Sequence, residues 1–121
     1  MKKANKMEKI DDRIFLMHAE VCKAMANPVR LKVLSALQNG EQSVEAMVKL
    51  LKLRKANLSQ HLAILRQRGI VATRRDGLHI YYRCANSKML KACAILREVL
   101  LEQLAEGGKL MKQANRQRGM K

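Results

Sequence analysis

Residues 55–83 read KANLSQHLAILRQRGIVATRRDGLHIYYR, and within this stretch the apolar residues change from a helical to a strand-like spacing. Leu58, Leu62 and Leu65 recur at steps of three and four residues, which is the spacing of one buried face of a helix. Gly69 follows the last of these leucines and favours the end of the helix there. The first part of the stretch therefore predicts an amphipathic helix with a polar outer face.

The second part of the stretch predicts a β-hairpin. Ile70–Arg75 and His79–Arg83 are typical of strands, and the second of these segments holds both tyrosines of the chain. Asp76-Gly77 between them is a strong signal for a two-residue hairpin turn. Arg74 and Arg75 lie beside this turn, so the hairpin presents basic side chains directly after the helix.

Two further helices are predicted immediately upstream. Pro28 suits the first turn of a helix with Asn27 as its N-cap, and Asn39-Gly40 is a signal for its end. Its inward residues are expected to be Leu31, Leu34 and Leu37. Ser43 then caps a short helix, and the apolar face of that helix consists of Val44, Met47, Val48 and Leu51. Because only residues 52–54 separate it from the helix at Lys55, the pair has the layout of a helix-turn-helix.

One more helix is predicted at each end of this core. The first has an apolar stripe formed by Ile14, Met17, His18, Val21, Cys22 and Met25. The last is capped by Asn86 or Ser87 and closed by Gly107-Gly108, and its stripe includes Met89, Cys93, Leu96 and Leu100. The predicted fold class is mainly α with a β-hairpin wing, a winged helix-turn-helix in which four helices, two strands and a fifth helix follow in order. We place this domain at residues 10–106, between basic flexible tails at residues 1–9 and 107–121.

Composition agrees with such a domain and indicates its partner. The chain has 121 residues, which suits one domain, and it is 48% hydrophobic but only 2% aromatic, which favours packed helices over a large β-sandwich. The formal net charge of +15 makes a polyanion the default partner. No apolar run is long enough to span a bilayer, so we expect double-stranded DNA rather than a membrane.

The cysteines and the N-terminal residues indicate a location. Three cysteines without close spacing do not form a disulfide framework, and a reducing cytoplasm suits them. The basic start of the chain leads into Asp11 and Asp12 rather than into the apolar core of a secretion signal. We therefore expect a cytoplasmic, nucleoid-associated protein.

Four segments resemble the ArsR/SmtB family of bacterial winged-helix repressors. They are AMANPVRL (residues 24–31), NLSQHL (57–62), LRQRGIV (65–71) and RRDG followed by IYYR (74–83). The similarity extends from about His18 to about Leu104. The resemblance implies a homodimer formed through the first and last helices, operator binding in the absence of effector, and release when an effector binds.

The helix that begins at Lys55 is the candidate reader of DNA, because the major groove admits one α-helix whose N-terminal side chains reach base edges. Its exposed or half-exposed polar residues are expected to be Lys55, Asn57, Ser59, Gln60 and His61. The family resemblance implies a groove-facing side formed by Lys55, Ala56, Asn57, Ser59 and Gln60. His61 adjoins the buried Leu62 and is less available. The competing interpretation is an ordinary solvated polar face.

Other basic residues are candidates for contacts outside the major groove. Arg74, Arg75 and His79 flank the hairpin turn and suit phosphate or minor-groove contact. Arg66 and Arg68 have two interpretations, phosphate contact or simple solvation. We expect the basic tails to add salt-sensitive attraction that does not depend on sequence.

The chain departs from the known sensing sites of the family that it resembles. Where some members carry a Cys-Val-Cys-like segment it has Ser43-Val44-Glu45, and Ser35 occupies the place of a thiol in persulfide sensors. The last helix lacks the histidines of another metal site; its charged positions include Lys88, Lys91 and Arg97. Neither a zinc nor an arsenic site carries over, and no resident cofactor is indicated.

Three thiols remain as candidate effector or redox groups, namely Cys22, Cys84 and Cys93. If the first and last helices pack together, Cys22 and Cys93 approach each other and suit disulfide or polysulfide formation, or a soft metal or metalloid ion. His18 lies four residues before Cys22, a spacing that can supply two ligands to a metal. The simpler interpretation is that both cysteines, like the eight methionines, pack as hydrophobic side chains.

Three other functional classes compete with an effector-released, sequence-specific repressor. An architectural protein would bind nucleic acid through charge alone, with a steep salt dependence and no sequence preference. An enzyme is disfavoured because the sequence has no phosphate loop, no paired catalytic carboxylates and no nucleophile with a partner. RNA binding is disfavoured because stacking platforms need aromatic side chains.

Overall fold

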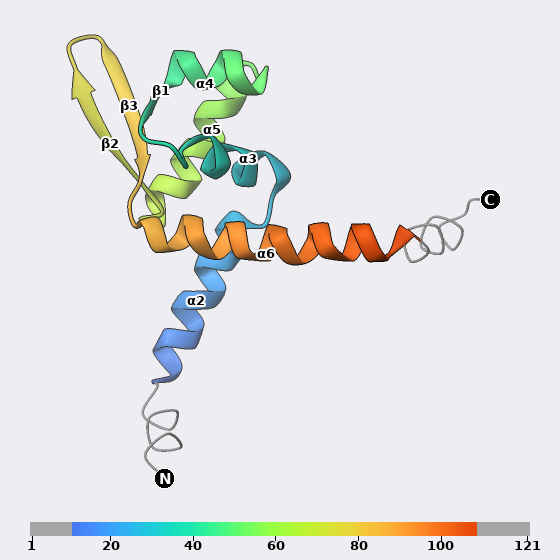
Figure 1. The fold of residues 1–121 in the computed structure, drawn as a ribbon. Helices are drawn as coiled ribbons and strands as arrows, with labels where there is room; N and C mark the ends of the chain where they lie inside the picture. Colours follow the sequence, from blue (N-terminus) through green and yellow to red (C-terminus); the bar gives the residue numbers. More distant parts are fainter. Residues whose placement is uncertain (1–10, 109–121) are drawn as a thin grey trace. The chain divides into compact units, whose positions relative to one another are not determined.

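The computed structural model describes residues 11–108 of the chain (Figure 1), which divide into a unit that ends at Asn86 and a unit that begins at Ser87. The elements of the first unit are α2 (Asp12–Met25), α3 (Pro28–Ala36), β1 (Gln42–Ser43), α4 (Val44–Leu51), α5 (Lys55–Gln67), β2 (Val71–Asp76) and β3 (His79–Cys84). The second unit contains α6 (Ser87–Glu106). The tails predicted at residues 1–9 and 107–121 lie outside the described residues except for Gly107 and Gly108.

Local capping explains where two of these helices begin. The Asn27 side chain accepts hydrogen bonds from the backbone N–H groups of Val29 and Arg30, and Pro28 occupies the first turn of α3. The Ser43 hydroxyl accepts from the N–H of Ala46 at the start of α4. Both caps confirm the prediction from sequence, because each depends only on residues within one turn.

The core of the first unit lies between α3, α4, α5 and the start of the hairpin. Its fully or almost fully buried members are Val33, Leu34, Leu37, Met47, Leu58, Leu62, Leu65, Ile70 and Val71. The prediction that Leu31 points inward is wrong, because its side chain is 39% exposed while Val33 is buried. An α-helix turns by about 100° per residue, so Val33, Leu34 and Leu37 share an arc from which Leu31 diverges.

The end of α3 also differs from the prediction. The helix ends at Ala36, whereas the sequence signal placed its end at Asn39-Gly40. A turn follows instead, in which the N–H of Gly40 donates to the carbonyl oxygen of Leu37 at 3.2 Å. Gly40 has a φ of +132°, which favours glycine, so this residue marks the end of the turn rather than of the helix.

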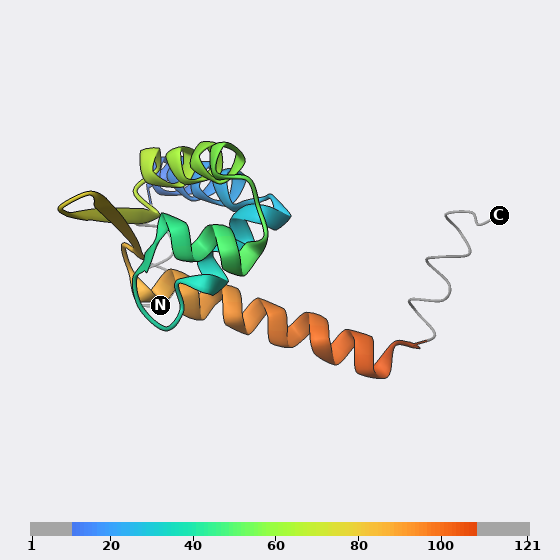
Figure 2. The ribbon, with the colours of Figure 1, turned by 90° about the horizontal axis from the view of Figure 1, so that it is seen from above.

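The hairpin is part of a three-stranded antiparallel sheet with the strand order β1-β3-β2. In β1, which the sequence did not predict, Gln42 is paired with Tyr82 and Ser43 with Tyr81. The turn is shifted by one residue from Asp76-Gly77, because Asp76 pairs with His79 and leaves Gly77 and Leu78 as the loop. Both views show the hairpin extending away from α3, α4 and α5 (Figures 1 and 2).

The terminal helices bury little of their apolar surface. Ala24 is the buried residue of α2, and α6 has none. The exposed large apolar side chains of the two helices are Ile14, Phe15, Leu16 and Met17 on α2, and Ile95, Leu96, Val99, Leu100, Leu101 and Leu104 on α6. Each helix thus carries an apolar face that the described part of the chain leaves exposed.

Candidate nucleic-acid interface

The helix α5 separates its apolar and polar residues onto different faces. Leu58, Leu62 and Leu65 are at most 1% exposed and hold the helix against the core. The candidate groove-facing residues are all exposed: Lys55, Ala56, Asn57, Ser59 and Gln60. Because the leucines recur at steps of three and four residues, one side of the helix is buried. The polar side chains of its N-terminal half remain accessible to a ligand.

The N-terminus of α5 suits an anion. Lys52 ends α4 in the left-handed conformation, with φ +56° and ψ +48°, which turns the chain sharply toward α5. Arg54 takes the N-cap position without a side-chain hydrogen bond to the helix, so the first backbone N–H groups have no side-chain cap. Arg54, Ala56, Asn57 and Gln60 line an open depression of about 410 Å³ there. Uncapped N–H groups, the positive helix end and a basic side chain together favour a phosphate.

His61, a further candidate from the sequence, has a role within the fold. Its ring is half-buried, and its Nδ1 accepts a hydrogen bond from Nε of Arg30 at 3.2 Å. The Nη1 of the same arginine donates to the carbonyl oxygen of Ala24 at 2.9 Å. Arg30 therefore connects the end of α2, α3 and the side of α5 through two hydrogen bonds.

On the wing, Arg74 is held by neighbouring side chains. Its guanidinium donates through Nε to both carboxylate oxygens of Glu41 at 3.2 Å, and Nη2 forms an additional short contact with the same group. The guanidinium carbon lies 4.6 Å from the centre of the Tyr81 ring, and Nη1 lies 3.8 Å from Asp76. The hydrogen bonds with Arg74 lower the pKa of Glu41, and those with Glu41 raise the pKa of Arg74.

Glu45 lies near side chains of both α5 and the hairpin. It lies in the first turn of α4, and its carboxylate is 3.8 Å from Nζ of Lys55 and 3.9 Å from Nδ1 of His79. The structure thus gathers candidates from α5 and β3 around one acidic side chain. Arg75 is exposed, and within residues 11–108 it has no ion-pair partner. Sequence reasoning missed Glu41 and Glu45, because pairing between separate elements leaves no local signal.

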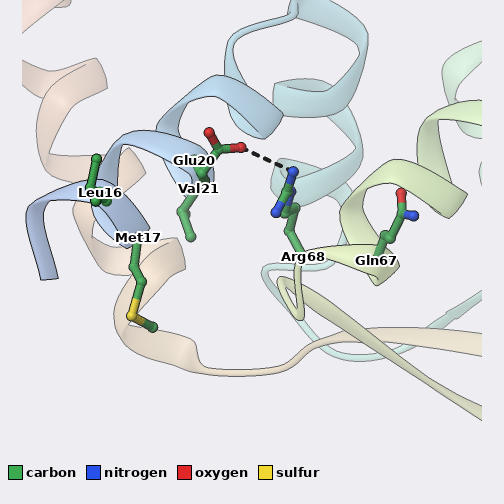
Figure 3. Close-up of a pocket in the computed structure, with 6 residues that line it drawn as sticks. All are labelled: Leu16, Met17, Glu20, Val21, Gln67 and Arg68. Atoms are coloured by element: carbon green, nitrogen blue, oxygen red, sulfur yellow. Dashed lines mark ion pairs between the residues drawn. The ribbon is translucent and has the colours of Figure 1, made fainter. Parts of the chain in front are cut away.

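Arg68, at the end of α5, is paired on another part of the unit. Its Nη2 lies 2.9 Å from a carboxylate oxygen of Glu20 on α2. Figure 3 shows this ion pair beside an open pocket of about 310 Å³, which is lined by Leu16, Met17, Glu20, Val21, Gln67 and Arg68. For Arg68 the sequence left two interpretations open, phosphate contact or simple solvation, and neither included an ion pair with Glu20. Arg66 is exposed.

The three candidate thiols occupy separate elements. Cys22 is exposed on α2, whereas Cys84 at the end of β3 and Cys93 on α6 are half-exposed. The thiol of Cys84 lies 3.3 Å from the carbonyl oxygen of Asn86. His18 is exposed on α2, the helix that also carries Cys22. Within residues 11–108 no three His, Cys, Asp or Glu side chains gather in a way that could hold a metal ion.

None of the helices within residues 11–108 combines the length and the apolar character needed to cross a bilayer.

Comparison with known proteins places these features among transcriptional regulators. Residues 27–73 match the model of a family described as bacterial regulatory protein, arsR family. An HTH-type transcriptional regulator of Mycobacterium tuberculosis, itself uncharacterised, is 35% identical over 94 residues, which are 77% of this chain and 82% of that protein. A biofilm growth-associated repressor of Agrobacterium fabrum is 43% identical over 70 residues, or 58% of this chain and 60% of the relative.

Solved structures agree with the sequence comparisons. A homodimeric winged helix-turn-helix DNA-binding domain from Mycobacterium bovis has a TM-score of 0.72 and 33% identity, covering 81% of this chain and 94% of that one. The predicted winged helix-turn-helix fold is therefore confirmed.

Proposed function

The chain belongs to the ArsR family of bacterial regulatory proteins, a family of transcriptional regulators with a helix-turn-helix DNA-binding fold, and from this premise we propose that it is a sequence-specific repressor. One observation carries the proposal. The N-terminal half of α5 exposes Lys55, Asn57, Ser59 and Gln60, while the leucines of the same helix are buried. Asn and Gln suit bidentate pairing with adenine, and Lys suits donation to guanine, so this face can distinguish base pairs in the major groove.

The wing and the uncapped end of α5 supply contacts to the backbone of DNA in this proposal. Arg75 on the hairpin and Arg54 at the start of α5 are exposed cations on either side of the reading face. Phosphate contacts position a protein on the duplex without carrying sequence information. Arg74 and His79 contribute after their pairing with acidic side chains is exchanged for phosphate.

The protein acts as a homodimer in this proposal. The apolar faces of α2 and α6 are exposed in the single chain, and burying them needs a partner surface. A second copy supplies the same two faces, and the related domain from Mycobacterium bovis is described as homodimeric. Two recognition helices related by a twofold axis then read half-sites about one helical turn apart.

Release from DNA is assigned to an effector that acts through thiols. Cys22, Cys84 and Cys93 are each at least partly accessible, which redox or sulfur chemistry requires. A soft metal or metalloid ion is the alternative effector chemistry, with His18 as an additional ligand. Such a regulator works in the cytoplasm without enzymatic activity.

The alternative function is an architectural protein that binds nucleic acid through charge, for which the net charge of +15 is the supporting observation.

A selection experiment separates these two functions. The purified protein is incubated with a library of random-sequence duplexes, and the enriched sequence is compared with its scrambled version in gel-shift titrations at one salt concentration. A repressor prefers the enriched duplex, which contains an inverted repeat, by at least about 1,000-fold. Equal affinity for both duplexes contradicts the proposal and supports the architectural protein.

The effector is then tested on the enriched duplex. Arsenite, zinc, cadmium, a sulfane sulfur donor and peroxide are added to the complex formed by the wild type and by Cys22→Ser, Cys84→Ser and Cys93→Ser. Thiol sensing predicts that one agent releases the wild type and that at least one serine variant resists it. If all four proteins respond alike to every agent, the thiol mechanism is wrong while the repressor function stands.

A further inference from the structure

Besides Asp76 of the hairpin, two acidic side chains lie among the cations of the candidate DNA interface. We call Glu41 and Glu45 the acidic pair. Glu45 faces Lys55 and His79 at 3.8 and 3.9 Å, and Glu41 accepts several hydrogen bonds from Arg74. Carboxylates repel the phosphates of DNA, so their presence at this face opposes the binding that the net charge favours.

The backbone fixes both members of the pair. Glu45 lies in the first turn of α4, which the Ser43 hydroxyl caps through the N–H of Ala46 at 3.0 Å. Glu41 directly precedes β1, the short strand that pairs with β3 of the wing. The pair is therefore carried by residues 41–45, which include β1 and the first turn of α4, and β1 attaches this segment to the sheet. This position explains how two glutamates reach both α5 and the hairpin.

We propose that the acidic pair determines specificity by neutralising, in the free protein, cations that would otherwise bind any phosphate. The inference rests on the proposed function and deepens it. A lysine or arginine paired with a carboxylate must lose that partner before it can contact a phosphate and release the counterions condensed on DNA. Non-specific complexes depend almost entirely on such phosphate contacts, whereas specific complexes add contacts to bases. The pair therefore weakens non-specific binding more than operator binding.

The size of the effect follows from the exposure of these groups. The side chains of Glu45 and Lys55 are 54% and 69% exposed, so water and salt screen their interaction. Exposed ion pairs change an equilibrium by a factor of up to about five. Removing one glutamate is thus expected to raise affinity for non-specific DNA by about three- to five-fold near 0.1 M salt. Each cation made available steepens the dependence of log K on log salt by about 0.9.

The test uses the full chain and a fluorescein-labelled duplex of scrambled sequence, titrated from about 0.05 to 0.3 M NaCl at one fixed pH. The variants are Glu41→Gln and Glu45→Gln. Glu98→Gln is the matched control, because Glu98 is exposed on α6 and has no ion pair within residues 11–108. A second pair of proteins, Lys55→Gln and the double variant Lys55→Gln/Glu45→Gln, tests whether Glu45 acts through Lys55.

The inference predicts that Glu41→Gln and Glu45→Gln bind the scrambled duplex more tightly and with a steeper salt dependence. The affinity of Glu98→Gln should rise by less than two-fold. Removing Glu45 should have a smaller effect once Lys55 is absent. The inference also predicts that affinity for the enriched duplex rises less than affinity for the scrambled one. An equal gain in Glu98→Gln, or no gain in either variant, overturns the inference and leaves the proposed function intact. If the wild type binds neither duplex, the proposed function itself fails and this inference with it.

Discussion

Replacing Arg30 by methionine removes the two hydrogen bonds that connect α2, α3 and α5. The guanidinium donates to the carbonyl oxygen of Ala24 at 2.9 Å and to Nδ1 of His61 at 3.2 Å, and the site is partly buried. Methionine retains most of the apolar stem, so the change removes mainly the donors. Hydrogen bonds from charged donors contribute about 1.5–3 kcal/mol each, and partial exposure favours the lower end of that range. For the two bonds together, we expect the free energy of unfolding to fall by about 3 kcal/mol.

The assay is urea unfolding followed by far-UV circular dichroism at one fixed protein concentration, because the stability of a dimer depends on concentration. Lys32→Met, on the exposed side of α3, is the matched control and should change stability by less than about 0.5 kcal/mol. His61→Ala and the double variant complete a mutant cycle, for which we expect a coupling energy of about 1 kcal/mol. A stability of Arg30→Met equal to that of Lys32→Met, or strictly additive effects with His61→Ala, would refute the reasoning.

Three further predictions concern the wing and the terminal helices. Gly77→Ala should lower stability by about 1 kcal/mol in urea unfolding, because Gly77 has a φ of +64°, which a side chain disfavours. Arg75→Ala on the adjoining strand β2 is its control and should leave stability unchanged. The carboxyl carbon of Glu41 should titrate in NMR below the usual range for glutamate and return toward that range in Arg74→Gln. A pKa lowered in the folded state contributes stability above the ordinary pKa of glutamate, and this stability is lost as the pH falls. An identical titration midpoint in the variant would contradict the pairing. Leu96→Glu, at a position 59% exposed in the single chain, should convert a dimer to monomers in light scattering, and an unchanged mass would exclude this face of α6 from the interface.

The order of the helices and the wing could be predicted from the sequence because local rules determine it. The leucines of α5 repeat with the period of a helix, and Asn27 and Ser43 act on N–H groups within three residues. The same period correctly assigned the exposed face of α5. These features need no knowledge of what lies across the fold.

What the sequence did not predict depends on contacts between distant elements. The strand β1 has only two residues, too few for an alternating pattern, and it forms because Tyr81 and Tyr82 of β3 lie beside it. The pairing of His61 with Arg30 joins residues 31 positions apart. The positions of Glu41 and Glu45 near the wing likewise follow from tertiary packing. Leu31 was assigned inward because three leucines at equal steps imitate a helical face.

The most direct test of the central claim is the loss of sequence preference when the reading face of α5 is removed. Asn57→Ala/Gln60→Ala is titrated against the enriched and the scrambled duplex at one salt concentration, with Gln38→Ala, an exposed residue of the turn after α3, as control. Each bidentate contact contributes about 1–3 kcal/mol of discrimination, so the ratio of the two affinities should fall by at least about 30-fold while scrambled-duplex affinity stays within two-fold. An unchanged ratio in the double variant would show that α5 does not read the bases.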